Sequence, residues 1–497
     1  MARFATNPQI HADSLEKTVD VFLKFLSFRG TRNLPPSLLL FLYFFLALYS
    51  SIFAQNRSSA FLTPSQNESV QKPATTNKKA QQAFEKSTKF YAEKNFAMAA
   101  AWVDEALKND SVFAEAHFRK AQLYEIFTQP ELALQSYRKA IVLRPEAPSF
   151  VFAYQKLIDY HLREGQYAQA KRDLERYIPL LKPNSIAQKR AERQLRTCEY
   201  GEKAMLNPLI INPEELSDTV NKYLLQYFPS LTADGETLLF TALNESNDED
   251  LFLTTYQNGS WQKPVAISDK INTNENEGTG ALSADGRTLV FTACNRRDGY
   301  GSCDLYISHK VGNDWEKPKN LGIEINSHFW DSQPTLSPDG QTLYFVSDRK
   351  GGIGGRDVWY STLNSKGQWT PARNIGDVVN TVDDEASPFM HANGHTLFFA
   401  SEGHEGLGGY DLFYADSTLT GWQKPRNLGY PINNAENQVA LVITADGKYG
   451  YYSYDTKKPG VQRMSKIYRF LIPNQLKKQF NVVNSLKGVV TDSKTQK

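Results

Sequence analysis

The stretch LSADGRTLVFTACNRRDGYGSCDLYIS, from Leu282 to Ser308, begins with a Ser-Ala-Asp-Gly turn that is followed by an alternating apolar run. The turn needs a residue with positive φ, which glycine supplies, and the run has the two-residue period of a β-strand. Close copies occur at four other places: LTADGETLLFTA from Leu231, LSPDGQTLYFVS from Leu336, MHANGHTLFFAS from Met390 and ITADGKYGYYSY from Ile443. The chain therefore contains one turn-and-strand phrase five times.

The five phrases belong to one long repeat. Their turn glycines follow one another at spacings of 51, 54, 54 and 53 residues: Gly235, Gly286, Gly340, Gly394 and Gly447. A second marker, a β-branched apolar residue followed by asparagine, precedes each turn at the same four spacings: Asn221, Asn272, Asn326, Asn380 and Asn433. Two markers with the same spacings indicate an internal repeat of about fifty residues.

Each complete repeat contains four pieces with strand character. The strand before the turn is followed by a strand such as TLYFVS, a glycine-rich loop, a third strand such as DLYIS, and a piece around Trp and Pro. Proline cannot donate a ladder hydrogen bond, so we expect the Trp-Pro piece at the outer edge. Four strands in each of five repeats are typical of a five-bladed β-propeller, whose closed ring protects the sheet edges.

The two ends of the repeat array predict how the ring closes. The last repeat lacks a Trp-Pro piece, and the orphan segment NPLIINPEELSDTVN precedes the first repeat. In the complete repeats an apolar residue stands four positions before the β-branched one, and Leu216 and Val220 reproduce this spacing in the orphan segment. We therefore expect the segment with Leu216 and Val220 to supply the outer strand of the fifth blade and to close a propeller over residues 206–478.

Residues 79–205 have the 3.6-residue period of amphipathic helices. Three helix–turn–helix corners, EKNFAMA from Glu93, FTQPELA from Phe127 and EGQYAQA from Glu164, mark three units, and the first two share small and aromatic residues at a 34-residue spacing. This pattern resembles the tetratricopeptide repeat, whose stacked helix pairs leave a groove for peptides or proteins. The alternative is that a short array only packs against the next domain. The expected fold class is multidomain: an α-helical array followed by an all-β propeller.

The N-terminal part predicts export. Residues 38–48 are apolar, which is shorter than the ~20 residues of a membrane span but suits the core of a signal peptide, and Ala54 offers a cleavage position. We assign residues 1–54 to a signal peptide with a long lead, or to an anchor if it is not cleaved. The polar residues 55–78 are expected to form a linker.

The three cysteines suit an exported protein. Cys294 and Cys303 flank a glycine-containing loop, and strands paired on either side of it would bring them within disulfide reach. We predict this disulfide, with two free thiols as the alternative. Cys198 is expected to be a buried apolar residue rather than a nucleophile.

The sequence offers no convincing site for chemistry. The net charge is +2 without a long basic run, whereas nucleic-acid binding needs clustered Lys and Arg. His391 and His395 stand four residues apart across a turn, where that spacing does not place both on one helical face. We find no nucleophile–base pair, metal-ligand spacing or phosphate loop, and we expect no enzyme activity, catalytic residue, metal or cofactor.

One set of polar residues recurs nine positions before each turn glycine: Gln226, Glu277, Asp331, Glu385 and Gln438. If the first strand of each blade lines the central channel, these side chains form a polar and acidic ring at one mouth. Such a rim could hold a cation or a basic peptide segment. The alternative is a solvated channel rim without a ligand.

The repeats resemble the WD40-like propeller of TolB-type periplasmic proteins. The phrases ACNRRDGYGSCDLY and NEG…LSADG extend the resemblance to a Bacteroidetes cell-envelope family of the PorE kind, over about residues 79–478. In that type IX secretion, OmpA-family architecture, a carboxypeptidase-regulatory-like β-sandwich and a peptidoglycan-binding domain follow the propeller. Residues 484–497 look like an incomplete start of the β-sandwich, so peptidoglycan is an expected partner only if a further C-terminal domain exists.

The resemblance implies a periplasmic, outer-membrane-associated scaffold that binds envelope or secretion-system proteins. From the charge distribution we expect no nucleic acid as a partner. Two other functions stay open. The propeller could be a ligand-binding module for a glycan or a peptide, or it could be a hydrolase, for which the sequence shows no triad.

Overall fold

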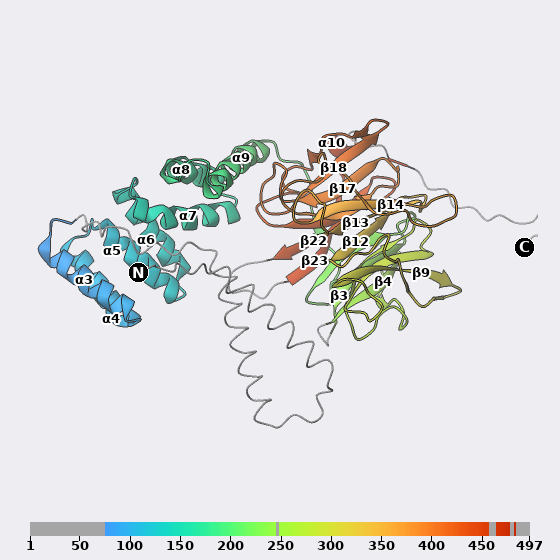
Figure 1. Cartoon of the computed structure of the whole chain (residues 1–497), viewed down its shortest axis with the longest axis horizontal. Coiled ribbons are helices and arrows are strands. Elements are labelled where there is room, and N and C mark those ends of the chain that lie inside the picture. The colour runs from blue at the N-terminus through green and yellow to red at the C-terminus, as the bar shows by residue number, and fades with distance from the viewer. Residues whose placement is uncertain (1–74, 245–247, 457–463, 478–481, 484–497) are drawn as a thin grey trace, which may run out of the picture. The chain divides into compact units, whose positions relative to one another are not determined.

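The structure consists of a helical array followed by a β-propeller (Figure 1). The computed structural model describes residues 75–244, 248–456, 464–477 and 482–483. The predicted signal peptide (1–54), nearly all of the predicted linker (55–78) and the predicted start of a β-sandwich (484–497) lie outside these residues. The predicted fold class, an α-helical array followed by a five-bladed propeller, is confirmed.

The helical array contains three antiparallel helix pairs and a long terminal helix within the described residues. Their bounds are α3 (Lys78–Ala92) with α4 (Phe96–Asn109), α5 (Ala114–Ile126) with α6 (Pro130–Leu143), α7 (Val151–Arg163) with α8 (Tyr167–Tyr177), and α9 (Ile186–Leu206). Small residues stand where the helices approach closely: Ala99, Ala133 and Ala170 are all buried. The array is therefore built from the three corners expected from the sequence.

Each corner turns at one residue with positive φ: Lys94 at 58°, Thr128 at 56° and Gly165 at 65°. The first two are 34 residues apart, whereas the third follows after 37. A short 3₁₀ turn, η2 (Pro148–Phe150), precedes α7 and takes up the extra residues. The irregular third repeat thus keeps the same corner geometry.

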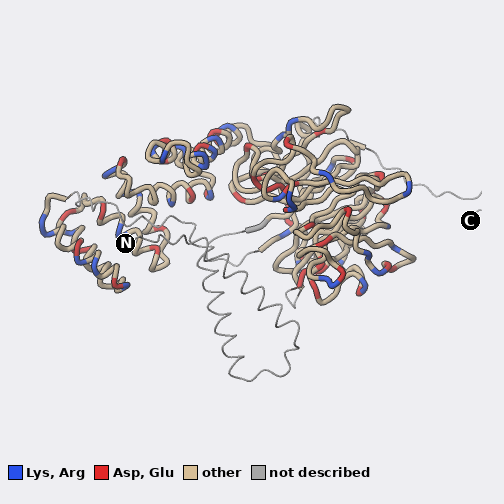
Figure 2. Tube along the Cα trace, viewed as in Figure 1, with Lys and Arg blue, Asp and Glu red and all other residues tan. Residues whose placement is uncertain are grey.

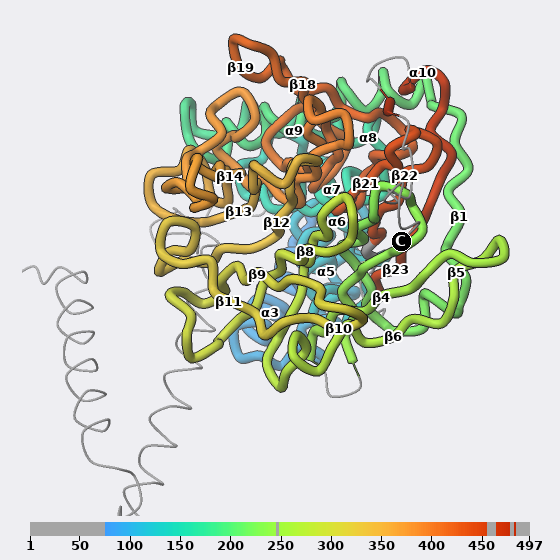
Figure 3. Tube along the Cα trace, turned by 90° about the vertical axis from the view of Figure 1, so that its right-hand side faces the viewer, coloured from blue at the N-terminus to red at the C-terminus, as the bar shows by residue number. Residues whose placement is uncertain are grey.

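Five antiparallel sheets form the blades, which follow one another around the ring in chain order (Figure 3). Blade 1 contains β2 (Gln226–Leu231), β3 (Thr237–Leu243), β4 (Glu249–Gln257), β5 (Ser260–Trp261) and β6 (Val265–Ala266); blade 2 contains β7 (Glu277–Leu282), β8 (Thr288–Cys294), β9 (Cys303–Val311), β10 (Asp314–Trp315) and β11 (Lys319–Asn320). Blade 3 contains β12 (Asp331–Leu336), β13 (Thr342–Ser347), β14 (Asp357–Thr362) and β15 (Arg373–Asn374); blade 4 contains β16 (Glu385–Met390), β17 (Thr396–Ser401), β18 (Asp411–Thr418), β19 (Gly421–Trp422) and β20 (Arg426–Asn427). Blade 5 contains β21 (Gln438–Ile443), β22 (Tyr449–Thr456), β23 (Met464–Leu471) and β1 (Glu214–Glu215), and the short helix α10 (Asn474–Lys477) follows it.

The outer strand of blade 5 comes from the segment before blade 1. Glu214 and Glu215 pair with Arg469 and Tyr468 of β23, and the Leu216 N–H donates to the Ile467 carbonyl at 3.0 Å. Leu216 and Val220 are buried in one apolar cluster with Ile467. The ring is therefore closed by hydrogen bonds and by apolar burial between the two ends of the propeller sequence.

In each repeat one asparagine side chain holds the loop that leads to the next blade against the third strand of its own blade. In blade 2, the Asn326 side chain accepts from the Leu305 N–H at 2.8 Å and donates to the Leu305 carbonyl at 3.0 Å. The same pair of bonds joins Asn272 to Leu251, Asn380 to Val358, Asn433 to Leu412 and Asn221 to Ile467. The asparagine marker of the sequence repeat is thus explained by backbone hydrogen bonds that these side chains satisfy.

The Trp-Pro pieces differ from the expectation in one respect. Trp261, Trp315 and Trp422 lie in two-residue strands that extend the end of the third strand, not in the outer strand proper. The outer ladder is formed by the residues after the proline, in β6, β11, β15 and β20. Proline separates the two short pairings because it has no N–H to donate.

Candidate functional site

The Cys294–Cys303 disulfide lies at one end of blade 2. The two cysteines are directly opposite each other in the β8–β9 ladder, with Cα atoms 3.9 Å apart, and the structure joins them. Cys198 on α9 is buried and reduced, and burial raises the pKa of its thiol to about 12. A thiol held neutral in this way is not a nucleophile.

The five polar residues expected at a channel rim occupy equivalent positions, but they do not form a solvated rim. Each is the first residue of the innermost strand of its blade, and each is 0% exposed: Gln226, Glu277, Asp331, Glu385 and Gln438. Each accepts a hydrogen bond from a backbone N–H of the loop that enters its blade. The rim expectation is therefore wrong, because these side chains satisfy buried backbone groups and leave no ring of oxygens for a ligand.

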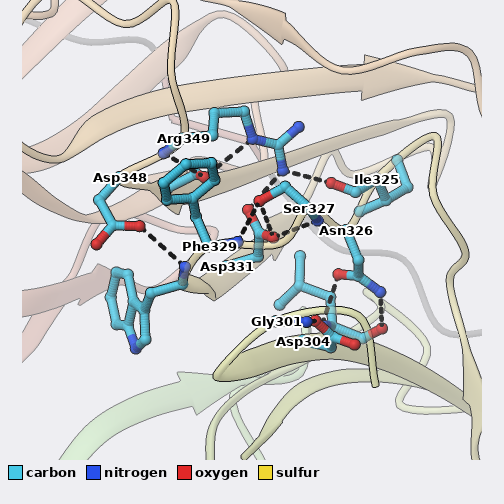
Figure 4. A network of polar contacts seen from close by, with 12 residues as sticks. Gly301, Asp304, Ile325, Asn326, Ser327, Phe329, Asp331, Asp348 and Arg349 are labelled. Atoms are coloured by element: carbon cyan, nitrogen blue, oxygen red, sulfur yellow. Dashed lines mark hydrogen bonds and ion pairs between the residues drawn. The ribbon is translucent and has the colours of Figure 1, made fainter. Parts of the chain in front are cut away.

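Two of the three acids are neutralised by arginine. Arg296 contacts Glu277 at 2.8 Å, Arg349 contacts Asp331 at 2.5 Å, and both guanidinium groups also donate to a backbone carbonyl of the same loop. Figure 4 shows this arrangement around Asp331, with Arg349 bridging the carboxylate and the Ile325 carbonyl. Such pairs compensate the cost of burying a charge.

Glu385 in blade 4 differs from these two acids. His404 takes the place of the arginine and bonds the Val379 carbonyl at 2.9 Å, and within the described residues no basic side chain is paired with Glu385. Burial raises the pKa of Glu385 to about 7. Blade 4 therefore holds a buried carboxyl that is partly neutral near physiological pH.

A second set of equivalent residues surrounds the axis of the propeller. Each inner strand contains a β-bulge with positive φ two residues after the buried polar residue: Phe228, Thr279, Gln333, Ser387 and Ala440. Positive φ is uncommon for residues other than glycine, so these positions need additional support from the fold. The five bulge residues share no residue type, although proline follows three of them, at positions 229, 334 and 388.

Hydrogen bonds between blades support the five bulges. The backbone N–H groups of Phe228, Thr279, Gln333, Ser387 and Ala440 donate to side-chain oxygens of the preceding blade, which are Ser453 Oγ, Thr241 Oγ1, Thr279 Oγ1, Gln333 Oε1 and Ser387 Oγ. These bonds run once around the ring. One cavity that the inner strands enclose on the axis has a volume of about 30 Å³, about the share of one water molecule.

A larger cavity lies at the beginning of the inner strands, at the mouth of the channel. It has a volume of about 530 Å³ and is lined in part by Tyr227, Phe228, Glu249, Trp330 and Arg356. Glu249 accepts a hydrogen bond from the Tyr227 hydroxyl, and the Arg356 guanidinium lies 4.6 Å from the centre of the Trp330 ring. The mouth thus combines a carboxylate, a guanidinium cation and three aromatic rings, which is a polar and stacking set suited to a small polar ligand.

The helical array carries a surface groove of its own. A cavity of about 530 Å³ is lined by residues from α4, α5 and α6, including Leu107, Arg138, Lys139, Val142 and Leu143. Val142 is 65% exposed, and no acidic residue is among those that line the groove. Apolar side chains lie beside Lys139 and beside Arg138, whose guanidinium also lies 3.9 Å from the Asp173 carboxylate. This set is suited to a segment that carries both apolar and acidic residues.

The two histidines of the fourth turn, His391 and His395, lie in different environments. His391 is fully buried next to the Thr444 carbonyl, whereas His395 lies in the exposed part of its turn. Among the residues that the structure describes, no group of three or more His, Cys, Asp or Glu side chains could hold a metal ion. None of the helices in the described part of the chain combines the length and the apolar character that crossing a membrane requires.

Comparisons with known proteins show likeness of parts of the chain. No family model matches the sequence, and none of the curated proteins matches it. Among solved structures, TolB from Acinetobacter baumannii is similar at 16% identity over 50% of this chain and 54% of that chain, with a TM-score of 0.32. A putative TolB from Agrobacterium tumefaciens is similar at 14% identity over 49% of this chain and 76% of that chain, with a TM-score of 0.33.

The Arabidopsis OM64 TPR domain is similar at 23% identity over 24% of this chain and 94% of that chain, with a TM-score of 0.20. This chain thus spans about half the length of the Acinetobacter TolB that it matches (54%). At these identities and scores the likenesses do not bear on function, and the fold rests on the strand pairing and helix bounds described above.

Proposed function

We propose that the chain is a non-enzymatic adaptor that binds other proteins through its helical array. The groove between α4 and α6 carries this proposal, because it exposes Val142 and places Arg138 and Lys139 beside it. Burial of an exposed apolar side chain with a charged border is the usual way in which a protein segment gains affinity and orientation. The partner segment is therefore apolar and acidic, in a helix or an extended peptide.

The finer part of the proposal concerns the place of action. The apolar stretch 38–48 with Ala54 behind it supports export, and the Cys294–Cys303 disulfide fits an oxidising compartment such as the periplasm. The sequence resemblance to TolB-type and PorE-like proteins supports envelope or type IX secretion proteins as partners, close to the outer membrane. Sequencing of the mature N-terminus after fractionation of the cells tests this, since cleavage predicts a chain that begins at Gln55 in the periplasmic fraction.

Affinity capture tests the adaptor role. The tagged full-length chain is expected to retain specific proteins from envelope extracts, and Val142→Asp is expected to lose them, because a carboxylate in the groove repels an acidic segment. Val265→Asp is the matched control, since Val265 is 61% exposed on the outer strand β6. Equal capture by both variants would show that the groove is not the binding site.

The cavity at the channel mouth favours a second candidate function, a ligand-binding module for a glycan or a peptide. Its aromatic rings can stack on a sugar or a side chain, while Glu249 and Arg356 can orient polar groups. Binding to a glycan and peptide array tests this candidate, with Trp330→Ala as the variant that removes the ring. Unchanged retention of the same ligand by Trp330→Ala would exclude the mouth as its site.

A further inference from the structure

Three blades carry the same rigid loop tip between the second and third strands. Tyr300, Ile353 and Leu407 each stand four residues before an aspartate in the first two residues of the third strand, and their backbone N–H groups donate to that carboxylate. The next residue in each loop, Gly301, Gly354 or Gly408, donates to the same aspartate. Each tip is therefore held in one conformation by its own blade.

The glycines also press each tip against the loop that enters the next blade. A Cβ atom at Gly301 would lie 1.9 Å from the Phe329 carbonyl oxygen, and one at Gly354 would lie 2.3 Å from that of Thr381. Figure 4 shows Gly301 and Asp304 close to this entering loop. The side chain that precedes each glycine is thus presented outward from a fixed backbone.

The structure shows what covers one of these tips. Leu407 of blade 4 is fully buried in the apolar cluster of the helical array, together with Tyr167, Leu174 and Cys198. The Tyr167 hydroxyl donates to the Leu407 carbonyl at 2.7 Å, and Arg193 of α9 forms an ion pair with Asp383 at the border. Figure 2 shows that α9 carries both basic and acidic residues along its length. Helices α8 and α9 therefore provide an apolar pocket for the tip and a cation for the acid beside it.

The other two tips are open. Tyr300 is 42% exposed and Ile353 is 40% exposed, and each has a second exposed apolar side chain beside it, Phe329 and Val382 respectively. Arg356, three residues after Ile353, lies over the ring of Trp330, which follows Phe329 in the chain. We name Tyr300, Phe329, Ile353 and Val382 the tip surface. It continues directly from the helical contact, because Val382 adjoins Asp383.

We infer that the tip surface docks a partner protein through a pocket between two α-helices, as α8 and α9 receive Leu407 within the chain. The inference rests on the proposed adaptor function and assigns it a second surface with a defined class of partner. Tyr300 and Ile353 insert between the partner's helices, which lie beside the layer formed by α8 and α9. A second copy of this chain offers no such pocket at α8 and α9, because its own Leu407 fills it.

A photo-crosslinker placed in the full-length chain tests the inference. With p-benzoylphenylalanine at position 353, crosslinked peptides identified by mass spectrometry are expected to map to two adjacent helices of another protein. The same group at position 265 is the control and is expected to give none of these products. Crosslinks that reach only a second copy of this chain, a glycan or a strand, or the absence of crosslinks from position 353, would overturn the inference.

Affinity measurements with the crosslinked partner show whether it binds the tip surface or the groove of the helical array. Ile353→Asp, and independently Val382→Asp, are expected to weaken binding tenfold or more, whereas Val265→Asp changes it less than twofold. All three sites are exposed, so thermal melting is expected to be unchanged. If Val142→Asp abolishes binding and both tip variants bind like the unmodified chain, the inference about the tip surface is refuted, while the adaptor function stands. If the unmodified chain captures no protein, the adaptor function itself fails.

Discussion

The side chain of Asn221 brackets the backbone of Ile467, 246 residues further along the chain. Asn221 Oδ1 accepts from the Ile467 N–H at 2.9 Å, and Asn221 Nδ2 donates to the Ile467 carbonyl at 2.9 Å. The same two bonds join asparagine to the third strand in the other four blades, where the partners are 21 or 22 residues apart. At Asn221 the same pair of hydrogen bonds joins the two ends of the propeller sequence and so helps to close the ring.

Asn221→Ala is therefore expected to destabilise the protein by about 1–3 kcal/mol, because it leaves buried backbone groups of Ile467 without the amide. Hydrogen exchange in β23 should also become faster, since the outer strand β1 loses its anchor. Urea unfolding and exchange measured by mass spectrometry check both effects. Asn207→Ala, at an exposed helix end, should change stability by less than about 0.5 kcal/mol.

The Cys294–Cys303 disulfide closes a short loop of nine residues' separation. Replacing both cysteines by serine is expected to lower the free energy of unfolding by roughly 2–3 kcal/mol, mainly through the larger entropy of the unfolded chain. Thermal melting with and without a reductant should show the same difference for the unmodified protein. Titration of the denatured chain should find one thiol, that of Cys198, before reduction and three after it; three thiols before reduction would contradict the bridge.

Glu385 should make stability depend on pH. Its pKa is raised to about 7 in the folded protein from an ordinary value of 4.5, so the folded state binds the proton more tightly and stability falls as pH rises from about 4.5 to 7. Glu385→Gln removes this loss, and glutamine already occupies the equivalent position in blades 1 and 5. The variant should be more stable than the unmodified protein above pH 7, by at most about 3 kcal/mol.

The difference in stability between the unmodified protein and Glu385→Gln reports on Glu385 alone, although other groups titrate in the same pH range. Asp411, whose pKa burial also raises to about 7, remains in both, as do His391 and His404, whose pKa values burial lowers. Glu277→Gln is the matched control. Burial also raises the pKa of Glu277, but Arg296 opposes this shift by bonding the carboxylate at 2.8 Å. Glu277→Gln should therefore destabilise the protein, because Arg296 would lose its buried anionic partner. Equal effects of the two substitutions would contradict the assignment of Glu385 as an unpaired acid.

Gly201 of α9 lies against the ring of Tyr167. A Cβ atom there would come within 2.7 Å of the ring carbons, and both residues are buried. Gly201→Ala is expected to cost about 1–3 kcal/mol through overpacking, although alanine has the higher helix propensity. Lys203→Ala, an exposed position two residues later, should be nearly neutral. Thermal melting compares the two variants, and a more stable Gly201→Ala protein would show that the ring can move aside.

For several residues of the site, the sequence predicted the position in the repeat but not the burial or the partners. The repeat places Gln226, Glu277, Asp331, Glu385 and Gln438 at equivalent points, but it does not state that all five are buried. A signal was nevertheless present: an arginine follows the turn glycine by nine or ten residues in blades 2 and 3, where the acids Glu277 and Asp331 need a partner. The bulge residues around the axis share no residue type, because their support comes from side chains of the preceding blade.

The sequence by itself determined the number of blades, their order and the segment that closes the ring. Turn glycines, strand periods and the asparagine marker are local features, and each acts within one repeat, so their spacing is sufficient. Only the tertiary structure decided which equivalent residues are buried, paired or exposed. Tyr300, Ile353 and Leu407 occupy one position of the repeat, yet Leu407 alone is covered, because burial depends on the surface that packs against a residue and not on its neighbours in sequence.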